Sequence, residues 1–244
     1  MNPAAVILAE SGGSGMSFMI RHLVDFELFG QKLSITTTHI AIVIVDLILI
    51  LFAIAVKVKF SHPDNVPGTF QSAVEFLVEF VGNFVSDNMG PKNGKRFLNY
   101  TGSIFLFILL SNISGLLGLR PPTADYGVTL PLGLLTCFLI HFNGMRSKKF
   151  GYVKAYFEPI PLFLPMNLIS EISTPISLSL RLFGNVMSGT VMMGLWYSLM
   201  PVFARLGVPS FLHIYFDLFS GAIQTYVFCM LTTIFIQDKM GDPE

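Results

Sequence analysis

The sequence predicts an all-α integral membrane protein with about five membrane-spanning helices, one amphipathic surface helix and a long, tilted C-terminal helical hairpin. Hydrophobic residues make up 52% of the chain and charged residues only 12%, whereas soluble domains carry roughly 25% charged residues. The mean hydropathy is +0.66. The 244 residues suffice for about five spans, because a hydrocarbon core of ~30 Å takes about 20 helical residues.

The apolar segments follow one another along a single predicted membrane domain, 1–244. In chain order they are an N-terminal outer segment 1–37, a first span 38–56, an amphipathic helix 66–88, two spans at 98–119 and 128–142, and a hairpin at 162–237. In the amphipathic segment Glu75 and Glu79 interrupt apolar residues at helical spacing. This pattern favours a helix that lies on the membrane surface or packs beside the bundle.

The C-terminal hairpin has two arms that are longer than a membrane is thick. The arms are 162–200 and 210–237, so at ~1.5 Å per residue they are nearly 60 Å and about 40 Å long, against a core of ~30 Å. Tilting, or kinks near Pro165 and Pro175, must absorb the excess. A pair of overlong helices suggests a hairpin that is tilted against a large neighbour.

The basic residues predict the topology. With the N-terminus outside, ten of them flank the inner ends of the spans and four flank the outer ends. The inner ten are Lys57, Lys59, Lys92, Lys95, Arg96, Arg146, Lys148, Lys149, Lys154 and Lys239, and the outer four are Arg21, Lys32, Arg120 and Arg205. The positive-inside rule therefore predicts an outer N-terminus and a cytoplasmic C-terminus. We expect a multi-pass protein of the cell's inner (plasma) membrane.

Several classes of site find no support. The formal net charge is zero, so nothing indicates a nucleic-acid partner. Cys137 and Cys229 lie inside apolar runs, and no Cys/His cluster has the spacing of metal ligands, so we expect neither a metal nor a cofactor.

Arg181 is the one basic residue that belongs to neither side of the membrane. It lies about twenty residues from either end of its apolar segment, too deep for its side chain to reach water. Placing a guanidinium at the centre of a bilayer costs at least ~2.5 to 3.5 kcal/mol of free energy, and the group keeps its charge there. A structural ion pair is one interpretation, but no acid of this chain lies within a helical turn. A counter-charge on another polypeptide fits better.

Two polar stripes converge in the predicted hairpin. Ser177, Arg181 and Asn185 are spaced by four, so they share one helix face. Asp217 and Gln224, seven residues apart with Gly221 between them, share a face of the last helix. An apex near 202–203 places Arg181 level with Gln224, and Thr190 near the depth of Asp217.

Three strings carry a specific resemblance. They are PISLSLRLFGN at 175–185, IQTYVF at 223–228 and PTADYGVTL at 122–130. Together they resemble subunit a of F-type ATP synthases. The resemblance implies a stator channel subunit of the Fo sector, which is not an enzyme by itself and forms two offset half-channels. These pass protons or sodium ions to and from the carboxylates of a rotating c-ring, and the further partners are a subunit b dimer, the rest of F1Fo and membrane lipid.

The resemblance also implies roles for residues. Arg181 resembles the family's essential arginine, which faces the c-ring carboxylates and separates the half-channels. Asn185, Gln224 and Ser177 resemble polar residues that line or support the same path. Family members often carry an ionisable residue nine positions after the arginine, but here that position holds Thr190. Asp217 is then the main titratable group of the outer half-channel.

The roles of two acids stay open, and so do three other functions for the chain. Glu171 lies ~15 Å from Arg181 along the helix and either lines the inner half-channel or is an interfacial acid. Asp46 lies ~12 Å into the first span and either lines the outer vestibule or is structural.

The rival functions are a self-contained secondary ion transporter, an intramembrane serine hydrolase using Ser188, and a structural subunit without transport. The sequence does not distinguish protons from sodium ions.

Overall fold

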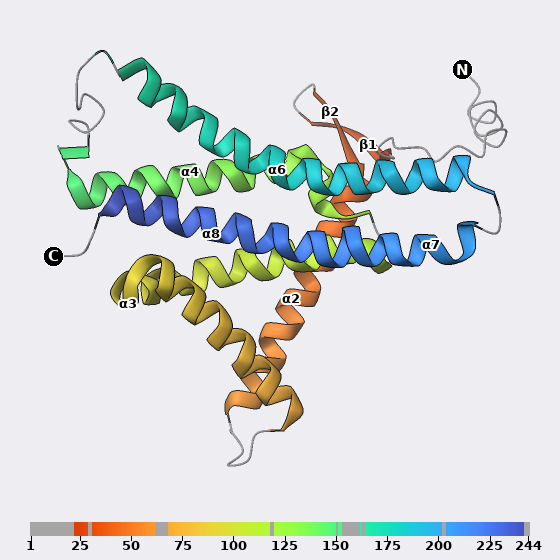
Figure 1. Ribbon diagram of the computed structural model, residues 1–244, viewed down its shortest axis with the longest axis horizontal. Helices are drawn as coiled ribbons and strands as arrows, with labels where there is room; N and C mark the ends of the chain where they lie inside the picture. Colours follow the sequence, from red (N-terminus) through yellow and green to blue (C-terminus); the bar gives the residue numbers. More distant parts are fainter. Residues whose placement is uncertain are drawn as a thin grey trace.

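The computed structural model describes most of the chain after residue 21. The described residues are 22–28, 31–61, 68–117, 120–149, 151–152, 162, 164–201 and 204–241. The long elements are the helices α2 (Thr37–Ser61), α3 (Thr69–Ile113), α4 (Tyr126–Lys148), α6 (Leu164–Leu199), α7 (Ala204–His213) and α8 (Gly221–Met240), with the π-helix η4 (Ile214–Ser220) between the last two. Short 3-10 turns are η1 (Ser114–Leu117) and η2 (Pro122–Ala124). The predicted all-α membrane class is confirmed for the bundle (Figure 1).

A small β-hairpin precedes the bundle and was not predicted within the outer segment 1–37. Strands β1 (His22–Leu28) and β2 (Gln31–Thr36) pair antiparallel, with Asp25 opposite Ser34 and an irregularity between His22 and Val24. In the sequence, Val24 and Phe26 alternate with polar residues, and an alternation with period two is typical of β-strands. The hairpin lies beside the start of α2 (Figure 1).

Four helical stretches in the described part of the chain are long and apolar enough to cross a membrane. They are Thr37–Ser61, Thr69–Leu116, Tyr126–Lys148 and Gly207–Met240. Helix α6 is not among them, although its 36 residues are more than a span requires. Its serines, asparagines, Glu171 and Arg181 lower its hydropathy, and those residues include most of the candidate site.

The amphipathic segment and the second span are joined in one bent element, α3, where the sequence suggested two helices with a basic linker. The bend is at Gly90, whose φ of 74° and ψ of 164° interrupt the helix. Glycine adopts this positive φ without a Cβ penalty, and Pro91 suits the first turn of the second limb. The limbs approach closely, because a Cβ on Gly94 would lie 3.0 Å from the Ser86 Cα.

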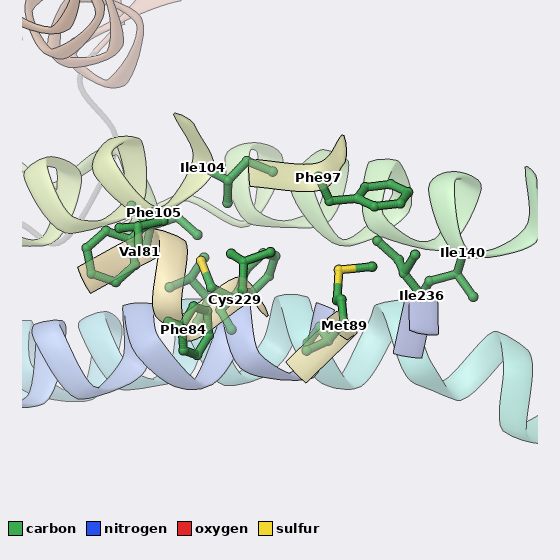
Figure 2. Packing of buried hydrophobic residues seen from close by; sticks show 14 residues of the cluster. Val81, Phe84, Met89, Phe97, Ile104, Phe105, Ile140, Cys229 and Ile236 are labelled. Atoms are coloured by element: carbon green, nitrogen blue, oxygen red, sulfur yellow. The ribbon is translucent and has the colours of Figure 1, made fainter. Parts of the chain in front are cut away.

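The first limb of α3 packs into the bundle on one side. Val81, Phe84 and Val85 are buried there, while Glu75 and Glu79 are exposed on the other face. Figure 2 shows Phe84 of this limb beside Cys229 of α8, and Met89 of the same limb near Ile236 of α8. The burial of this apolar face drives the limb against α8.

The long hairpin consists of α6 and the nearly continuous run α7–η4–α8, which lies alongside it in the opposite direction (Figure 1). The expected turn at 201–209 is shorter than predicted. Helix α7 already begins at Ala204, so Gly207 and Pro209 lie inside it. Pro209 is the sixth residue of this helix, and its missing N–H removes one backbone hydrogen bond from the second turn.

Helix α4 closes one side of α6 by a close backbone contact. A Cβ on Gly133 would lie 2.6 Å from the Pro175 carbonyl oxygen and 3.2 Å from the Ser179 Cβ. Only glycine permits two helices to approach this closely. The contact fixes Pro175, Leu178 and Leu182 toward the bundle, where they are buried.

Candidate ion path

Arg181 lies on the face of α6 that turns away from the bundle. Leu178 and Leu182 are buried, whereas Ser177 and Arg181 are exposed. Helical spacing of four places Ser177 and Arg181 on the same outward face. Among the described residues, no carboxylate lies within ion-pair distance of Arg181. Its charge is thus not compensated by an ion pair within the part of the chain that the structure describes.

Two contacts fix how the hairpin arms face each other. The Ser220 hydroxyl donates to the Asn185 Oδ1 at 2.7 Å, and a Cβ on Gly189 would lie 3.2 Å from the Phe216 Cβ. Four residues further along each antiparallel arm, this pairing brings Arg181 level with Gln224.

Asn185, Ser220 and Gln224 line the space between the two hairpin arms, which we call the polar lane. It contains amide donors without hydrogen-bond partners in the described residues. Gln224 is buried and its Nε2 has no hydrogen-bond partner in the described residues, and the same holds for the Asn185 Nδ2. A buried donor left unpaired costs about 1 to 3 kcal/mol. Two such donors beside Arg181 make this lane polar inside an apolar hairpin.

Asp217 lies in the middle of the π-helix η4 and has two close neighbours. Its Oδ2 is 2.7 Å from the His213 Nδ1, and a Cβ on Gly115 would lie 3.1 Å from its Cγ. π-Helical turns often mark functional sites. Thr190, by contrast, is exposed and donates its hydroxyl to the Val186 carbonyl of its own helix at 3.0 Å. The ionisable neighbour of Asp217 is thus His213.

His213 and Asn112 are polar residues of the lane that the sequence reasoning missed. Spacing of four on one helix was the available signal for His213 and Asp217. The buried Asn112 donates to the Gly221 carbonyl at 3.0 Å and accepts from the Thr123 hydroxyl at 2.7 Å. Asn112 was visible only as a lone amide near the end of an apolar run.

Glu171 lies near the other end of α6 and belongs to a polar cluster. Its Oε1 accepts a hydrogen bond from the Lys239 Nζ, and its Oε2 is 3.7 Å from the His141 Nε2. The His141 Nδ1 is 2.6 Å from the Tyr152 hydroxyl. The cluster borders a cavity of about 460 Å³. Only the tertiary fold brings His141 of α4 to Glu171.

The remaining candidates lie apart from these contacts. Asp46 is exposed on α2, whose buried residues are Thr38, Ala41 and Val45. Ser188 is exposed and donates to the Asn185 carbonyl at 2.9 Å, so no histidine base accepts its proton in the described residues. Those residues also contain no group of three or more His, Cys, Asp or Glu that could hold a metal.

Comparison with known proteins shows the family of this chain. Residues 37–237 match the family model described as ATP synthase A chain. The chain is 38% identical over 196 residues to the "ATP synthase subunit a, sodium ion specific" of Propionigenium modestum, covering 73% of this chain and 66% of that protein. It is 34% identical over 236 residues to the "ATP synthase subunit a" of Streptococcus agalactiae serotype Ia, covering 91% and 94%.

A third relative has the same name. The "ATP synthase subunit a" of Bacillus pumilus is 33% identical over 198 residues, which cover 72% of this chain and 81% of that protein. The family match includes α2 to α8 almost completely, and with them Arg181, Asn185, Asp217 and Gln224. The chain therefore belongs to the subunit a family of the bacterial F-type ATP synthases, membrane proteins of the Fo sector that take part in ion transport and ATP synthesis.

Proposed function

We propose that this chain forms two offset half-channels beside a rotating c-ring, with Arg181 as the fixed charge between them. The observation that carries the proposal is the outward position of Arg181 on α6 without a carboxylate partner in the described residues. A permanent charge deep in a membrane protein requires a counter-charge. The carboxylates of a c-ring that pass this face supply one in turn.

The outer half-channel follows the lane between the hairpin arms. Asp217 attracts the incoming ion, and the Asn185–Ser220 pair and Gln224 line the way to the level of Arg181. The ion then binds to a c-ring carboxylate, and after nearly a full rotation it leaves on the inner side near Glu171. Asp46 is exposed on α2, and we keep it as a further candidate for a residue that lines the outer vestibule.

Arg181 acts by electrostatics. Its charge stabilises the ionised form of the carboxylate that passes it, which favours release of the bound ion on the inner side. The same charge repels free cations that would otherwise cross directly between the half-channels. The membrane potential supplies about 2.3 kcal/mol per elementary charge per 100 mV, and a direct leak would dissipate it.

The resemblance and the basic residues supply the remaining parts of the proposal. The partners are the c-ring, the subunit b dimer and the rest of the complex, in the plasma membrane with an outer N-terminus. The transported ion is a proton or a sodium ion. A relative named as sodium ion specific makes sodium dependence the first property to measure.

The test replaces Arg181 with glutamine in the complete complex reconstituted in sealed vesicles. Arg181→Gln should abolish ion-driven ATP synthesis while the complex still assembles. Arg181→Lys should restore little, because an ammonium deprotonates in an apolar site and lacks the forked geometry. Met192→Gln places the same amide on an exposed part of the same helix and should leave synthesis intact. Coupled synthesis at the normal rate in Arg181→Gln would overturn the proposal.

A further inference from the structure

We propose that the cavity beside Glu171 is the inner port of the ion path, and that Lys239 and His141 position Glu171 as the charged residue of that port. The inference rests on the proposed function, because it names the machinery of one of the two half-channels. In the proposed function Glu171 is a single acid near the inner face, whereas here residues of α4 and α8 also have roles.

Four separate parts of the chain build the port. Glu171 comes from α6, Lys239 from the last turn of α8, His141 from α4 and Tyr152 from the residues after α4. These ends of α4 and α8 lie together, away from the apex of the hairpin (Figure 1). The Tyr152 hydroxyl contacts one ring nitrogen of His141, which turns the other nitrogen toward Glu171. The hydrogen bond therefore fixes the orientation of the imidazole.

Charged and polar groups surround the carboxylate of Glu171. Its side chain is 15% exposed, with an ammonium on one oxygen and an imidazole near the other. The other charged groups that line the cavity are Lys148 and Asp238. A cation that approaches Glu171 must compete with Lys239 for the carboxylate. It can therefore bind there only when the ion pair between Lys239 and Glu171 opens. Lys239 is a positioning residue, since it acts through Glu171.

A polar stripe leads from this port to Arg181. Asn167, Ser170 and Thr174 border the cavity, and Ser177 and Arg181 continue at spacings of three and four, which places all five on one helix face. From Thr174 to Arg181 the rise is only about 10 Å. The neighbouring faces of α6 carry exposed isoleucines and leucines instead. The stripe is therefore a wettable route along an otherwise apolar helix.

The first experiment maps water along α6 in intact complexes. Single cysteines replace Asn167 or Thr174 in a background without Cys137 and Cys229, and Ile172→Cys and Ile176→Cys are matched controls at similar depth, both exposed outward. A small, membrane-impermeant thiol reagent should label the first pair only from the inner side and the controls at least tenfold more slowly. Equal labelling of both pairs, or labelling of neither, would overturn the port.

The second experiment separates positioning from folding. Lys239→Gln should slow ATP-driven ion uptake several-fold and change its dependence on ion concentration at the inner face, with the outer dependence unchanged. Lys239→Arg should keep most of the rate, because it preserves the charge. Arg146→Gln removes a charge at the same end of α4 but outside the cavity and should behave as wild type.

The outcomes distinguish this inference from the proposed function. A Lys239→Gln complex that has wild-type inner-side kinetics would refute the role of Lys239, even where Arg181→Gln abolishes coupling. Equal loss at both faces, together with poor assembly, would refute it in favour of a purely structural ion pair. Coupled synthesis in Arg181→Gln would instead refute the two half-channels themselves.

Discussion

At the scale of single residues, Asp217 is held more firmly than a carboxylate at a membrane interface requires. His213, one turn earlier, contacts its Oδ2, and Gly115 leaves space for its carboxyl group. Between Leu98 and Leu117, and between Leu182 and Met200, no residue carries an ionisable acid or base other than Tyr100 and Tyr197. His213 and Asp217 are thus the ionisable pair nearest to the outer half of the lane.

Replacement of Asp217 by asparagine keeps its shape but removes its charge. Asp217→Asn should slow ion-driven ATP synthesis at least tenfold without preventing assembly, because an amide can neither attract nor exchange a cation. Adding Thr190→Glu should restore part of the rate if the facing helix shares the lane. Synthesis rates across the pH range provide the measurement. Full activity of Asp217→Asn at every pH would assign Asp217 to structure.

The space that Gly115 leaves is testable by adding one methyl group. Gly115→Ala brings a Cβ to 3.1 Å from the Asp217 Cγ, so the carboxyl group must move away from His213. We expect synthesis to slow several-fold at an unchanged amount of assembled complex. Gly82→Ala is the matched control, since nothing lies within 4 Å of its added Cβ. Equal rates for both variants would show that the position of the carboxylate is unimportant.

At the scale of elements, the contact between α4 and α6 sets where the polar face of α6 points. The close approach of Gly133 to the Pro175 carbonyl anchors α6 one and a half turns before Arg181. A rotation of α6 about its axis would carry Arg181 away from its outward position. The glycine on α4 is therefore as important for the direction of the charge as any neighbour on α6.

Gly133→Ala should strain this contact. A Cβ at 2.6 Å from a backbone oxygen forces the helices apart, and overpacking of this kind costs about 1 to 3 kcal/mol. The thermal inactivation temperature of the complex should fall, and coupled synthesis should fall with it. Gly102→Ala, whose nearest contact is an ordinary 3.8 Å to the Val81 side chain, should be tolerated. Equal thermal stability of the two variants would contradict the anchoring role.

The sequence was sufficient for some elements and not for others, for physical reasons. Apolar runs locate helices because burial in lipid or protein requires them, and α2, α4 and α8 are each apolar over the length of a span. The union of two predicted helices in α3 depends on the backbone at Gly90, and a Gly-Pro pair more often ends a helix than bends it.

Some residues of the candidate site could likewise be predicted from the sequence, and others could not. Spacing on one helix already grouped Ser177, Arg181 and Asn185, because a helical period is a local property. The cluster of His141, Glu171 and Lys239 joins three helices, so no local pattern could reveal it. The spacing of four residues between His213 and Asp217 is a local signal as well, but spacing alone does not show that the two side chains are in contact.

At the scale of the whole molecule, the two ionisable clusters lie toward opposite ends of the bundle. The His213–Asp217 pair is in the run that follows the hairpin apex, and the Glu171 cluster is where α4 and α8 end. Arg181 lies between them along α6. This order along the hairpin is the one that the proposed half-channels require.

The orientation of the bundle can be measured with impermeant labels. Single cysteines at Ser14 and Asp242, both outside the described residues, should react from opposite sides of sealed vesicles in a background without Cys137 and Cys229. Ser14 should react from the outer side, because ten of the basic residues would then flank inner ends. Labelling of both from one side would require an even number of membrane crossings.

The outward position of Arg181 also bears on how long an unassembled copy of this chain persists in the cell. Alone in the bilayer, the chain would present an ionised guanidinium to lipid, at a cost of at least ~2.5 to 3.5 kcal/mol. That is a large fraction of the ~5 to 15 kcal/mol that separates folded from unfolded proteins. Copies that have no partner should therefore unfold locally around α6 more often and be degraded sooner, so that the number of surviving copies would follow the number of c-rings proposed above as partners.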